Sequence, residues 1–333
     1  MITPKSTTIV IVSYKTGSVL FDCLSACLNL PEKPQIVLVD NGNPLSDLDK
    51  LGRWADANPQ ITLITGHGNI GFAAGVNKGV AASHTDYIWI LNPDAVPAPD
   101  TLTRHYQSIV DVDVPFLIGA AIRHSDGSEQ RGGRREVLTP RLAFIETFGL
   151  YRFARLHPFF ARYNHHEDAP EGRLVRMPVV SGASMFMRRE DFIRLNGFDE
   201  KYFMHVEDMD LCLRMGRMGG HVYYAGHIPL THIGGTSDAD KSFVEWHKAK
   251  GFVYYFHKNF GEQHSRLLLN LVAGGIYARY ALMNFKMGWQ KLGRRKPHEA
   301  APAAIDRIAE TLPVRHVFDE AVPAARKSHL NGG

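Results

Sequence analysis

The chain is poor in cysteine, and the cysteines it has do not form the paired spacing of a disulfide framework. Its 333 residues include three, at Cys23, Cys27 and Cys212. An odd, low count argues against a secreted scaffold held together by disulfides. Cys23 and Cys27 lie four residues apart on the apolar side of an expected helix, so we interpret both as packing residues.

A strong charge of one sign is also absent. The formal net charge is +4 from 38 basic and 34 acidic residues, which is too weak an excess to predict a nucleic-acid partner. The first residues, MITPKSTTIVIVS, lack the long apolar region and the cleavage site of a secretory signal peptide. The low cysteine count and the lack of a signal peptide predict a cytoplasmic protein. The weak net charge predicts that it does not bind nucleic acid.

Short apolar runs alternate with helix-like segments in the first hundred residues. The runs, which predict buried strands, are 8–14, 35–41, 61–65 and 87–92, and the helix-like segments are 17–29, 45–57 and 71–83. This alternation predicts a parallel sheet covered on both faces, with ligands at the carboxyl ends of its strands. The polar residues that follow the strands are therefore the candidates: Ser13, Tyr14, Asp40, Asn41, Asn69, Asn92 and Asp94.

The rest of the chain has weaker patterns. Residues 124–175 are rich in Arg, Gly, His and Pro, and we expect a long loop or helical insertion over the predicted site. Further segments predict a strand, a helix, a second strand and a helical region, at 179–190, 207–220, 221–226 and from about 243 onward. The Pro- and Ala-containing residues 298–333 predict a loose tail.

A glycine pattern, Gly66-x-Gly68-x-x-Gly71, matches the letters of a dinucleotide-binding turn. That turn normally follows the first strand of its unit, with an acidic residue about 20 positions later. Here the pattern follows the third predicted strand, and an NAD site would leave Asn69, Phe72 and Asn77 unexplained. An NAD-dependent oxidoreductase is therefore the alternative interpretation.

Seven segments in a fixed order carry a broader resemblance. They are IVIVSYK (9–15), IVLVDNG (36–42), GNIGFAAGVNKG (68–79), ILNPDA (90–95), VSGASMFMRRE (180–190), GFDEKYFMHVEDMDLCLR (197–214) and LTHIGG (230–235). In these segments, which cover roughly residues 7–236, the chain resembles the glycosyltransferase family 2 enzymes of GT-A fold, in particular their rhamnosyltransferase-like branch. Each segment is a weak signal alone, and the seven together are a strong one.

The resemblance implies an α/β GT-A fold with a mainly parallel central sheet, and the helical pattern from about residue 243 predicts a helical C-terminal extension. The expected GT-A domain covers 1–240, with a nucleotide-sugar half of about 1–123 and an acceptor half of about 124–240. A helical extension that associates with membranes would occupy 241–297, before the tail.

The resemblance also implies a nucleotide-sugar site. Asp40 would accept a hydrogen bond from the imide N–H of uracil or thymine, and Ser13 and Tyr14 would line the base and ribose. The implied site includes further residues, namely Asn41, Asn69, Gly71, Phe72, Asn77 and Asn92. Backbone N–H groups at the start of the helix after Gly71 favour a phosphate. The alternative for Asp40-Asn41-Gly42 is a simple turn.

A divalent cation, Mg²⁺ or Mn²⁺, would neutralise the departing diphosphate. Asp94 supplies a carboxylate at the end of a strand, while Asn92 stands where family members commonly place another acid. The resemblance makes His232 the second ligand, and imidazole favours Mn²⁺ over Mg²⁺. Alternatively, Asp94 is only a turn residue beside Pro93, and His232 has no ligand role.

A carboxylate base is expected at the start of the helix HVEDMDLCLR, which offers Glu207, Asp208 and Asp210. The resemblance assigns the base to Asp208, with Glu207 as the nearest competitor. Attack opposite the leaving phosphate would invert the anomeric centre. The alternative is that these acids only interact favourably with the helix dipole.

Residues 264–296 contain seven Lys or Arg and no Asp or Glu. Their apolar runs are shorter than the ~20 residues needed to span a bilayer. We expect either a basic helix at a membrane surface or a core or dimer helix, with one broad apolar face formed by Leu267, Leu271, Ile276, Tyr280 and Phe285. The basic run 131–137 is expected to meet the diphosphate of a lipid-linked acceptor or to be a solvated loop.

Together these features predict an inverting glycosyltransferase that uses a divalent metal and a dTDP- or UDP-linked sugar, with dTDP-rhamnose favoured by the branch resemblance. The acceptor would be a cell-surface glycan or its polyprenyl-diphosphate-linked precursor. The alternatives are the NAD-dependent oxidoreductase and a sugar-binding relative without catalytic activity.

Overall fold

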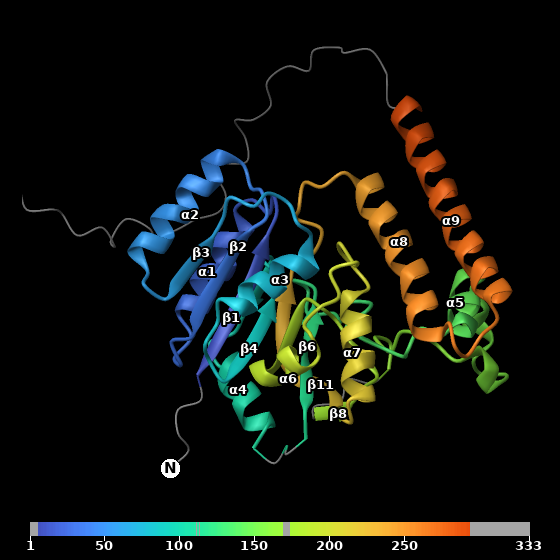
Figure 1. Cartoon of the computed structure of the whole chain (residues 1–333), viewed down its shortest axis with the longest axis horizontal. Helices are drawn as coiled ribbons and strands as arrows, with labels where there is room; N and C mark the ends of the chain where they lie inside the picture. Colours follow the sequence, from blue (N-terminus) through green and yellow to red (C-terminus); the bar gives the residue numbers. More distant parts are fainter. Residues whose placement is uncertain (1–5, 111, 113, 169–173, 294–333) are drawn as a thin grey trace, which may run out of the picture. The chain divides into compact units, whose positions relative to one another are not determined.

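The computed structural model describes residues 6–110, 112, 114–168 and 174–293 (Figure 1). Met1–Phe285 group into one compact unit, and Lys286–Gly333 form the second. Only 286–293, the end of the last helix, are described in the second unit. The predicted tail, 298–333, lies outside the described residues, and the predicted domain boundary at residue 240 stays a prediction.

The first part of the sheet is parallel, with the strand order β3-β2-β1-β4. Its strands are β1 (Thr7–Ser13), β2 (Gln35–Asp40), β3 (Ile61–Ile64) and β4 (Tyr87–Leu91), and the helices that follow the first three are α1 (Val19–Leu28), α2 (Leu45–Ala57) and α3 (Phe72–Ala81). Every residue of β1 and β4 is buried, which explains their continuous apolar sequences. The predicted strands and helices of this region are confirmed.

The sheet continues beyond β4 with mixed directions. The added strands are β5 (Ala95–Pro97), β6 (Phe116–Arg123), β8 (Leu174–Arg176), β10 (Ser184–Arg188) and β11 (His221–His232). β10 is antiparallel to β4 and β6, β11 is parallel to β6, and β5 and β8 are antiparallel to β11. β11 runs past its predicted end at residue 226. Its register with β6 shifts between Ala225 and Pro229, and pairing with β6 then resumes.

The remaining elements surround this sheet. β7 (Arg134–Arg135) and β9 (Val179–Val180) form a separate antiparallel pair. The helices are α4 (Thr101–Ser108), α5 (Pro140–Thr147), η1 (Leu150–Phe153), η2 (Pro158–Phe160), α6 (Arg189–Arg194), α7 (Glu207–Arg217), α8 (Lys241–Phe260) and α9 (Arg266–Gly293). Thr139 starts α5 by accepting a hydrogen bond from Leu142 N, with Pro140 at the first helical position.

The glycines between residues 66 and 79 differ in role: a Cβ on Gly66 or Gly68 would meet no atom within 4 Å, whereas Gly71 and Gly79 permit close packing. Gly71 has φ +87°, and a Cβ there would lie 2.4 Å from the carbonyl oxygen of Phe203. A Cβ on Gly79 would lie 2.5 Å from Val10 Cγ1, so glycine lets α3 pack closely on β1. The turn follows β3, which ends the strand order of the sheet. The chain therefore does not place this pattern where a dinucleotide fold uses it.

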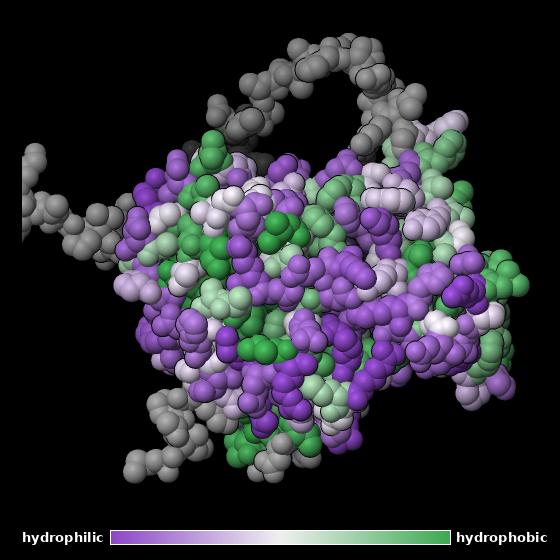
Figure 2. All heavy atoms as spheres, viewed as in Figure 1, coloured by the Kyte–Doolittle hydropathy of each residue, from purple (hydrophilic) through white to green (hydrophobic). Residues whose placement is uncertain are grey.

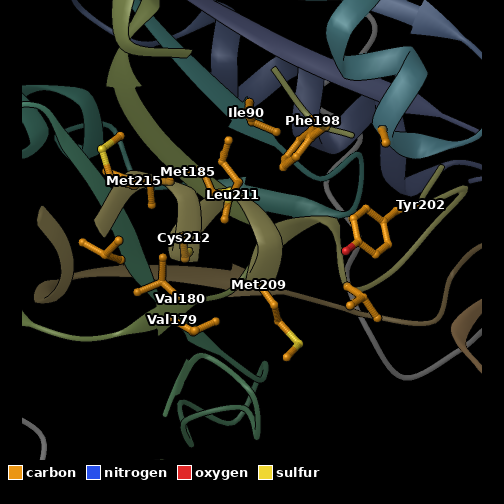
Figure 3. Packing of buried hydrophobic residues seen from close by; sticks show 14 of the residues in the cluster. Ile90, Val179, Val180, Met185, Phe198, Tyr202, Met209, Leu211, Cys212 and Met215 are labelled. Atoms are coloured by element: carbon orange, nitrogen blue, oxygen red, sulfur yellow. The ribbon is translucent and has the colours of Figure 1, made fainter. Parts of the chain in front are cut away.

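Helix α7 packs its apolar side against the sheet, next to the predicted acceptor site. Leu211, Cys212 and Met215 are buried in one cluster with Met185 and Val180 (Figure 3). All three cysteines are free and buried, so the prediction that Cys23 and Cys27 are packing residues is confirmed. This packing fixes the start of α7, where the candidate carboxylates lie.

Candidate active site

The carboxyl ends of three parallel strands carry predicted site residues. Ser13 ends β1, Asp40 ends β2, and Asn92 follows β4. Asp94 directly precedes β5, and pairing of Ala95 with His232 places the imidazole beside this carboxylate. His232 Nε2 lies 3.0 Å from Asp94 Oδ1, so the fold brings the two predicted metal ligands together across 138 residues of sequence.

The Asp94 carboxylate is buried and held on both oxygens. Thr236 Oγ1 donates a hydrogen bond of 3.0 Å to Oδ2, while Oδ1 faces His232. Burial raises the pKa of Asp94, but the hydrogen bond and charge of His232, with the bond from Thr236, outweigh it and lower the pKa below its usual value. Asp94 is therefore an anion at neutral pH.

Gln130 orients His232 and was missed by the sequence analysis. Its Oε1 lies 2.8 Å from His232 Nδ1, and because a carbonyl oxygen only accepts, Nδ1 carries a proton. Nε2 then faces Asp94 and, at 3.2 Å, the amide of Asn92. A hydrogen bond that fixes the ring and tautomer in this way is typical of a metal-ligating histidine.

The Asp94–His232 pair fits a divalent cation as a partial site. Two neighbouring ligands about 2.1 Å from an octahedral ion lie about 3 Å apart, which matches the 3.0 Å between Nε2 and Oδ1. Within the described residues no group of three or more His, Cys, Asp or Glu side chains could hold a metal ion. Water and substrate phosphates would have to complete the shell, as is usual for Mg²⁺ in nucleotide sites.

Asp40 is largely engaged by its own loop. Oδ1 accepts hydrogen bonds from Gly42 N, Asn43 N and Asn43 Nδ2 at 3.2, 2.9 and 2.7 Å. Oδ2 accepts one from Thr65 Oγ1 at 2.9 Å and retains a lone pair. The carboxylate thus forms the turn that the alternative interpretation predicted, and Oδ2 can still accept one hydrogen bond from a ligand.

The neighbours of Asp40 shape the same loops. Ser13 Oγ lies 3.1 Å from Thr16 Oγ1 and 3.2 Å from Asn43 Oδ1. Asn41 Nδ2 donates a hydrogen bond of 2.8 Å to Gly71 O. Tyr14 is half-buried, and its ring would contact a Cβ on Gly42 at 3.8 Å. Ser13 and Asn41 therefore build the loops around the site, and the ring of Tyr14 lies along them.

The polar residues of the 69–77 segment join α3 to the loop before α7. The Asn77 amide hydrogen bonds to both backbone groups of Phe198 and to Glu200 Oε1, each at 2.9 Å. Phe72 N donates to Phe203 O, and the rings of Phe72 and Phe198 lie 6.1 Å apart. Exposed Asn69 accepts from Gly71 N at 3.1 Å. Their nucleotide-sugar roles stay predictions.

The second set of candidates lies at the start of α7. Asp208 is buried, and its Oδ2 accepts hydrogen bonds from Arg135 Nη2 at 2.6 Å and from Gly182 N at 3.0 Å, while Oδ1 accepts from Met209 N at 2.7 Å. Burial raises the pKa of Asp208, but the adjacent Arg135 guanidinium outweighs it and lowers the pKa. Asp208 is thus a fixed anion.

Glu207 has the opposite electrostatic environment. It is 5% exposed, and Oε2 has no hydrogen-bond partner within the described part of the chain. Burial, followed by the charge of Asp208, raises its pKa to about 8. Two adjacent carboxyl groups whose pKa values are pushed apart are typical of acid–base sites.

Asp210, the third acid of this helix, is a structural residue. Tyr202 Oη and Asn259 Nδ2 donate to its Oδ1 at 3.3 and 3.2 Å. Arg214 Nε and Lys258 Nζ donate to its Oδ2 at 2.7 and 3.0 Å. Four donors saturate this carboxylate and connect α7 to α8, which leaves Asp208 and Glu207 as the candidate bases.

One short segment links the two halves of the site. Ala183 O accepts a hydrogen bond of 2.9 Å from Asn92 N, and Gly182 N donates to Asp208. A Cβ on Gly182 would lie 3.2 Å from Asp208 Cβ, so glycine permits this approach. Segment 181–183 is therefore bound on one residue by Asp208 and on the next by Asn92, whose amide lies 3.2 Å from His232 Nε2.

The arginines of the run 131–137 all have partners within the protein. Arg131 pairs with Glu146 at 3.1 Å, Arg134 with Glu129 at 2.9 Å, and Arg135 with Asp208. This run is therefore a set of ion pairs, and the sequence analysis missed the contact of Arg135 with a candidate base.

The family model for glycosyl transferase family 2 matches residues 8–194, more than half of the 333-residue chain. The chain belongs to glycosyl transferase family 2. The matched range contains Asp40, Asn92 and Asp94, while Glu207, Asp208 and His232 lie beyond it.

Individual proteins support the same family. An N-acetylglucosaminyl-diphospho-decaprenol L-rhamnosyltransferase of Mycobacterium tuberculosis (strain CDC 1551 / Oshkosh) is 26% identical over 250 residues, which cover 67% of this chain and 75% of the relative. Rhamnosyltransferase WbbL of Escherichia coli (strain K12) is 28% identical over 202 residues, 58% of this chain and 70% of the relative.

A solved structure shows the same fold. The mannosyltransferase PcManGT of Pyrobaculum calidifontis, in complex with GDP-Man and Mn²⁺, matches with a TM-score of 0.53 and 16% identity, covering 81% of this chain and 68% of that one. The chain is thus a rhamnosyltransferase-like glycosyltransferase of GT-A fold, and its relatives support a place in cell-wall or polysaccharide biosynthesis. An NAD-dependent oxidoreductase is not supported.

Proposed function

We propose that the protein transfers rhamnose from dTDP-rhamnose to a hydroxyl of a polyprenyl-diphosphate-linked glycan, with inversion of the anomeric centre. The observation that carries this proposal is that segment 181–183 joins the two candidate groups. Gly182 N donates to the buried Asp208, and Ala183 O accepts from Asn92, whose amide lies beside the Asp94–His232 pair. The M. tuberculosis relative is named for rhamnose transfer to such a lipid, which supports the transferred sugar and the acceptor.

On the donor side, Asp94 and His232 would hold a divalent cation, which when bound supplies positive charge to the departing diphosphate. Gln130 keeps His232 in the tautomer whose Nε2 faces Asp94. Asp40 Oδ2 accepts the imide N–H of thymine with its remaining lone pair. The Mn²⁺ in the complex of the related mannosyltransferase supports the cation.

On the acceptor side, Asp208 takes the proton of the attacking hydroxyl. Arg135 keeps Asp208 ionised, so the base is available throughout the neutral range. A base with a lowered pKa is weak by itself. Glu207, with a pKa of about 8 and a free Oε2, is the second candidate for this role.

The acceptor proposal includes a contact of α9 with the inner face of the cell membrane. Leu267, Leu271 and Leu282 are 72, 66 and 70% exposed along one side of this helix, while Leu269 is buried in the core and Ile276 packs against it. The expected single apolar face is therefore wrong: Ile276 lies opposite the leucine stripe. No described helix is long and apolar enough to cross a bilayer, so the proposed contact is peripheral.

Equilibrium binding to a panel of nucleotides tests this function. We expect dTDP and UDP to bind tightly with Mn²⁺ and weakly without it, and CDP and NAD not to bind. Incubation with dTDP-rhamnose and a polyprenyl-diphosphate-linked N-acetylglucosamine should then give a product of inverted configuration by NMR. Nucleotide binding without transfer to any such lipid would contradict the acceptor, and no nucleotide binding would favour the non-catalytic relative.

A further inference from the structure

The expected insertion leaves the active site and returns to it. Glu136 N donates a hydrogen bond of 2.9 Å to Tyr163 O, and Arg135 pairs with Asn164 in an isolated β-bridge. Tyr163 Oη lies 3.4 Å from Met209 Sδ, one residue beyond Asp208. Residues 136–163 therefore form a closed excursion, and its base contacts the candidate catalytic carboxylate.

The far part of this excursion exposes large apolar side chains. Phe144, Phe148, Phe153, Leu156 and Phe159 are 53, 65, 48, 78 and 46% exposed. Figure 2 shows hydrophobic residues at the end of the view where Figure 1 draws α5 together with the start of α9. Grouped exposure of this kind marks an interaction surface, because single exposed apolar residues are ordinary and clusters are not.

Positive charge accompanies these residues. Between 140 and 163 the sequence has four arginines and one glutamate, Glu146, which pairs with Arg131. The Arg141 guanidinium lies 5.4 Å from the ring centre of Phe159. Arg152 and Arg155 are exposed and form no ion pair in the described part of the chain. The surface is thus aromatic and basic, as in proteins that bind anionic lipid surfaces.

We propose that residues 140–160, defined here as the aromatic excursion, dock onto an anionic lipid surface and deliver the acceptor to Asp208. This rests on the proposed lipid-linked acceptor, whose diphosphate would lie among the headgroups while its sugar hydroxyl reaches the base of the excursion. Charge favours lipid over a second copy of the chain, because a two-fold contact would bring two copies of the same basic surface together. Acidic headgroups instead attract Arg152 and Arg155.

The test compares variants of the full chain on vesicles of phosphatidylcholine and phosphatidylglycerol. Phe148→Ser combined with Leu156→Ser should weaken binding by about tenfold or more, because two exposed apolar side chains lose their burial in the bilayer interface. The control is Leu45→Ser, an equally exposed leucine, at 79%, on α2, and it should bind as the wild type does. Arg152→Gln with Arg155→Gln should weaken binding at low salt, and only to vesicles containing phosphatidylglycerol.

Vesicle binding that is unchanged in both double variants overturns the proposal. Ultracentrifugation that shows self-association of the wild type, lost in Phe148→Ser/Leu156→Ser, with no vesicle binding, overturns it in favour of a second copy. The proposed function can be contradicted independently. If no nucleotide sugar binds but the double variants still lose vesicle binding, the lipid-docking surface is supported and the assignment of the donor is wrong. In support, dTDP affinity and transfer to a short-chain, water-soluble acceptor should be equal in wild type and variants.

Discussion

Arg135 Nη2 lies 2.6 Å from Oδ2 of Asp208, and the two side chains are 13 and 12% exposed. The same guanidinium nitrogen also donates to Val180 O at 3.0 Å, so the arginine is anchored to the backbone beside the carboxylate. A charge held at this distance with little solvent acts more strongly on its neighbour than a surface ion pair does. The proton affinity of Asp208 therefore depends on a residue of the insertion.

Replacing Arg135 by Gln should change both stability and the pH dependence of activity. The folded-state pKa of Asp208 is lowered, so the pair stabilises the fold above the unfolded pKa of about 3.9 and loses this effect as pH falls through the folded pKa. Arg135→Gln should lower the free energy of unfolding by about 3–5 kcal/mol at neutral pH and by less in acid. Urea unfolding across this pH range measures the difference.

The control for this variant is Arg131→Gln, whose side chain is 63% exposed and which should change stability by less than about 0.5 kcal/mol. Since Arg135 no longer lowers the pKa of Asp208, the acidic limb of the pH–rate profile should also move to higher pH. A profile that does not move would show that Asp208 is not the group that titrates in turnover.

Glu207→Gln should stabilise the protein at alkaline pH. Because burial and Asp208 raise the folded-state pKa to about 8, the wild type loses stability as pH rises from the unfolded pKa of about 4.3 towards 8. Gln resembles the protonated acid and removes this loss, so the variant should gain on the order of a few kcal/mol above pH 8 and almost nothing near pH 4. Glu262→Gln, at an exposed position, should give a flat difference. A flat difference for Glu207→Gln would mean that Glu207 is ionised.

The cation site is tested by loss and by gain of a ligand. Asp94→Ala should reduce Mn²⁺-dependent dTDP binding more than His232→Ala does, and Gln130→Ala should weaken it by about 10–100-fold through the unfixed ring. Asn92→Asp adds a carboxylate where the amide now lies 3.2 Å from His232 Nε2, and this variant should bind Mn²⁺ more tightly. Calorimetric titration measures all four, and full activity in EDTA would defeat the metal proposal.

Two variants separate the roles of Asp40. Asp40→Ala removes both the hydrogen bonds of the turn and the proposed acceptor for the imide. Asn43→Ala removes the side-chain donor to Oδ1, at 2.7 Å, and the hydrogen bonds of Asn43 to Ser13, but leaves Oδ2 in place. If Asp40 contacts the nucleobase, Asp40→Ala should weaken the binding of dTDP and UDP by about tenfold or more. Asn43→Ala should weaken this binding only slightly. Equal losses in the two variants would show that Asp40 acts only by shaping the turn.

The sequence predicts the first half of the fold well because local signals suffice there. β1 to β4 are continuous apolar runs that end at turn residues, and each begins and ends within a residue of its predicted bounds. β6 and α4 were not predicted. Gly119 interrupts the apolar sequence of β6, and it is needed because a Cβ there would lie 2.5 Å from Val180 Cβ. That reason involves a distant segment and leaves no local pattern.

The candidate site follows the same division. Asp94 is positioned by the strand before it, and its neighbour His232 was assigned through resemblance. The partners that set the electrostatics were missed: Gln130 lies 102 residues from His232, and Arg135 lies 73 residues from Asp208. Arginine and glutamine in a Gly-rich stretch look like solvated loop residues, and only the tertiary fold shows their partners.

The ion pair also changes what Asp208→Asn should do. Asn cannot take the acceptor proton, so turnover should fall by about 10²–10⁴. Dissociation constants for dTDP and dTDP-rhamnose should stay near wild type, because the side chain belongs to the acceptor side. The structure also predicts a loss of stability, since Arg135 would remain as a mostly buried charge without its carboxylate.

The double variant Asp208→Asn/Arg135→Gln separates catalysis from folding. It removes both charges, so it should recover much of the stability that Asp208→Asn loses while turnover stays low. Single-turnover rates and urea unfolding of the wild type, the two single variants and the double variant complete the cycle. Near-normal turnover in Asp208→Asn would exclude Asp208 as the base and assign the role to Glu207, because Asp210 is saturated by four donors from its own fold. Turnover that returns together with stability in the double variant would instead show that Asp208 contributes only to folding.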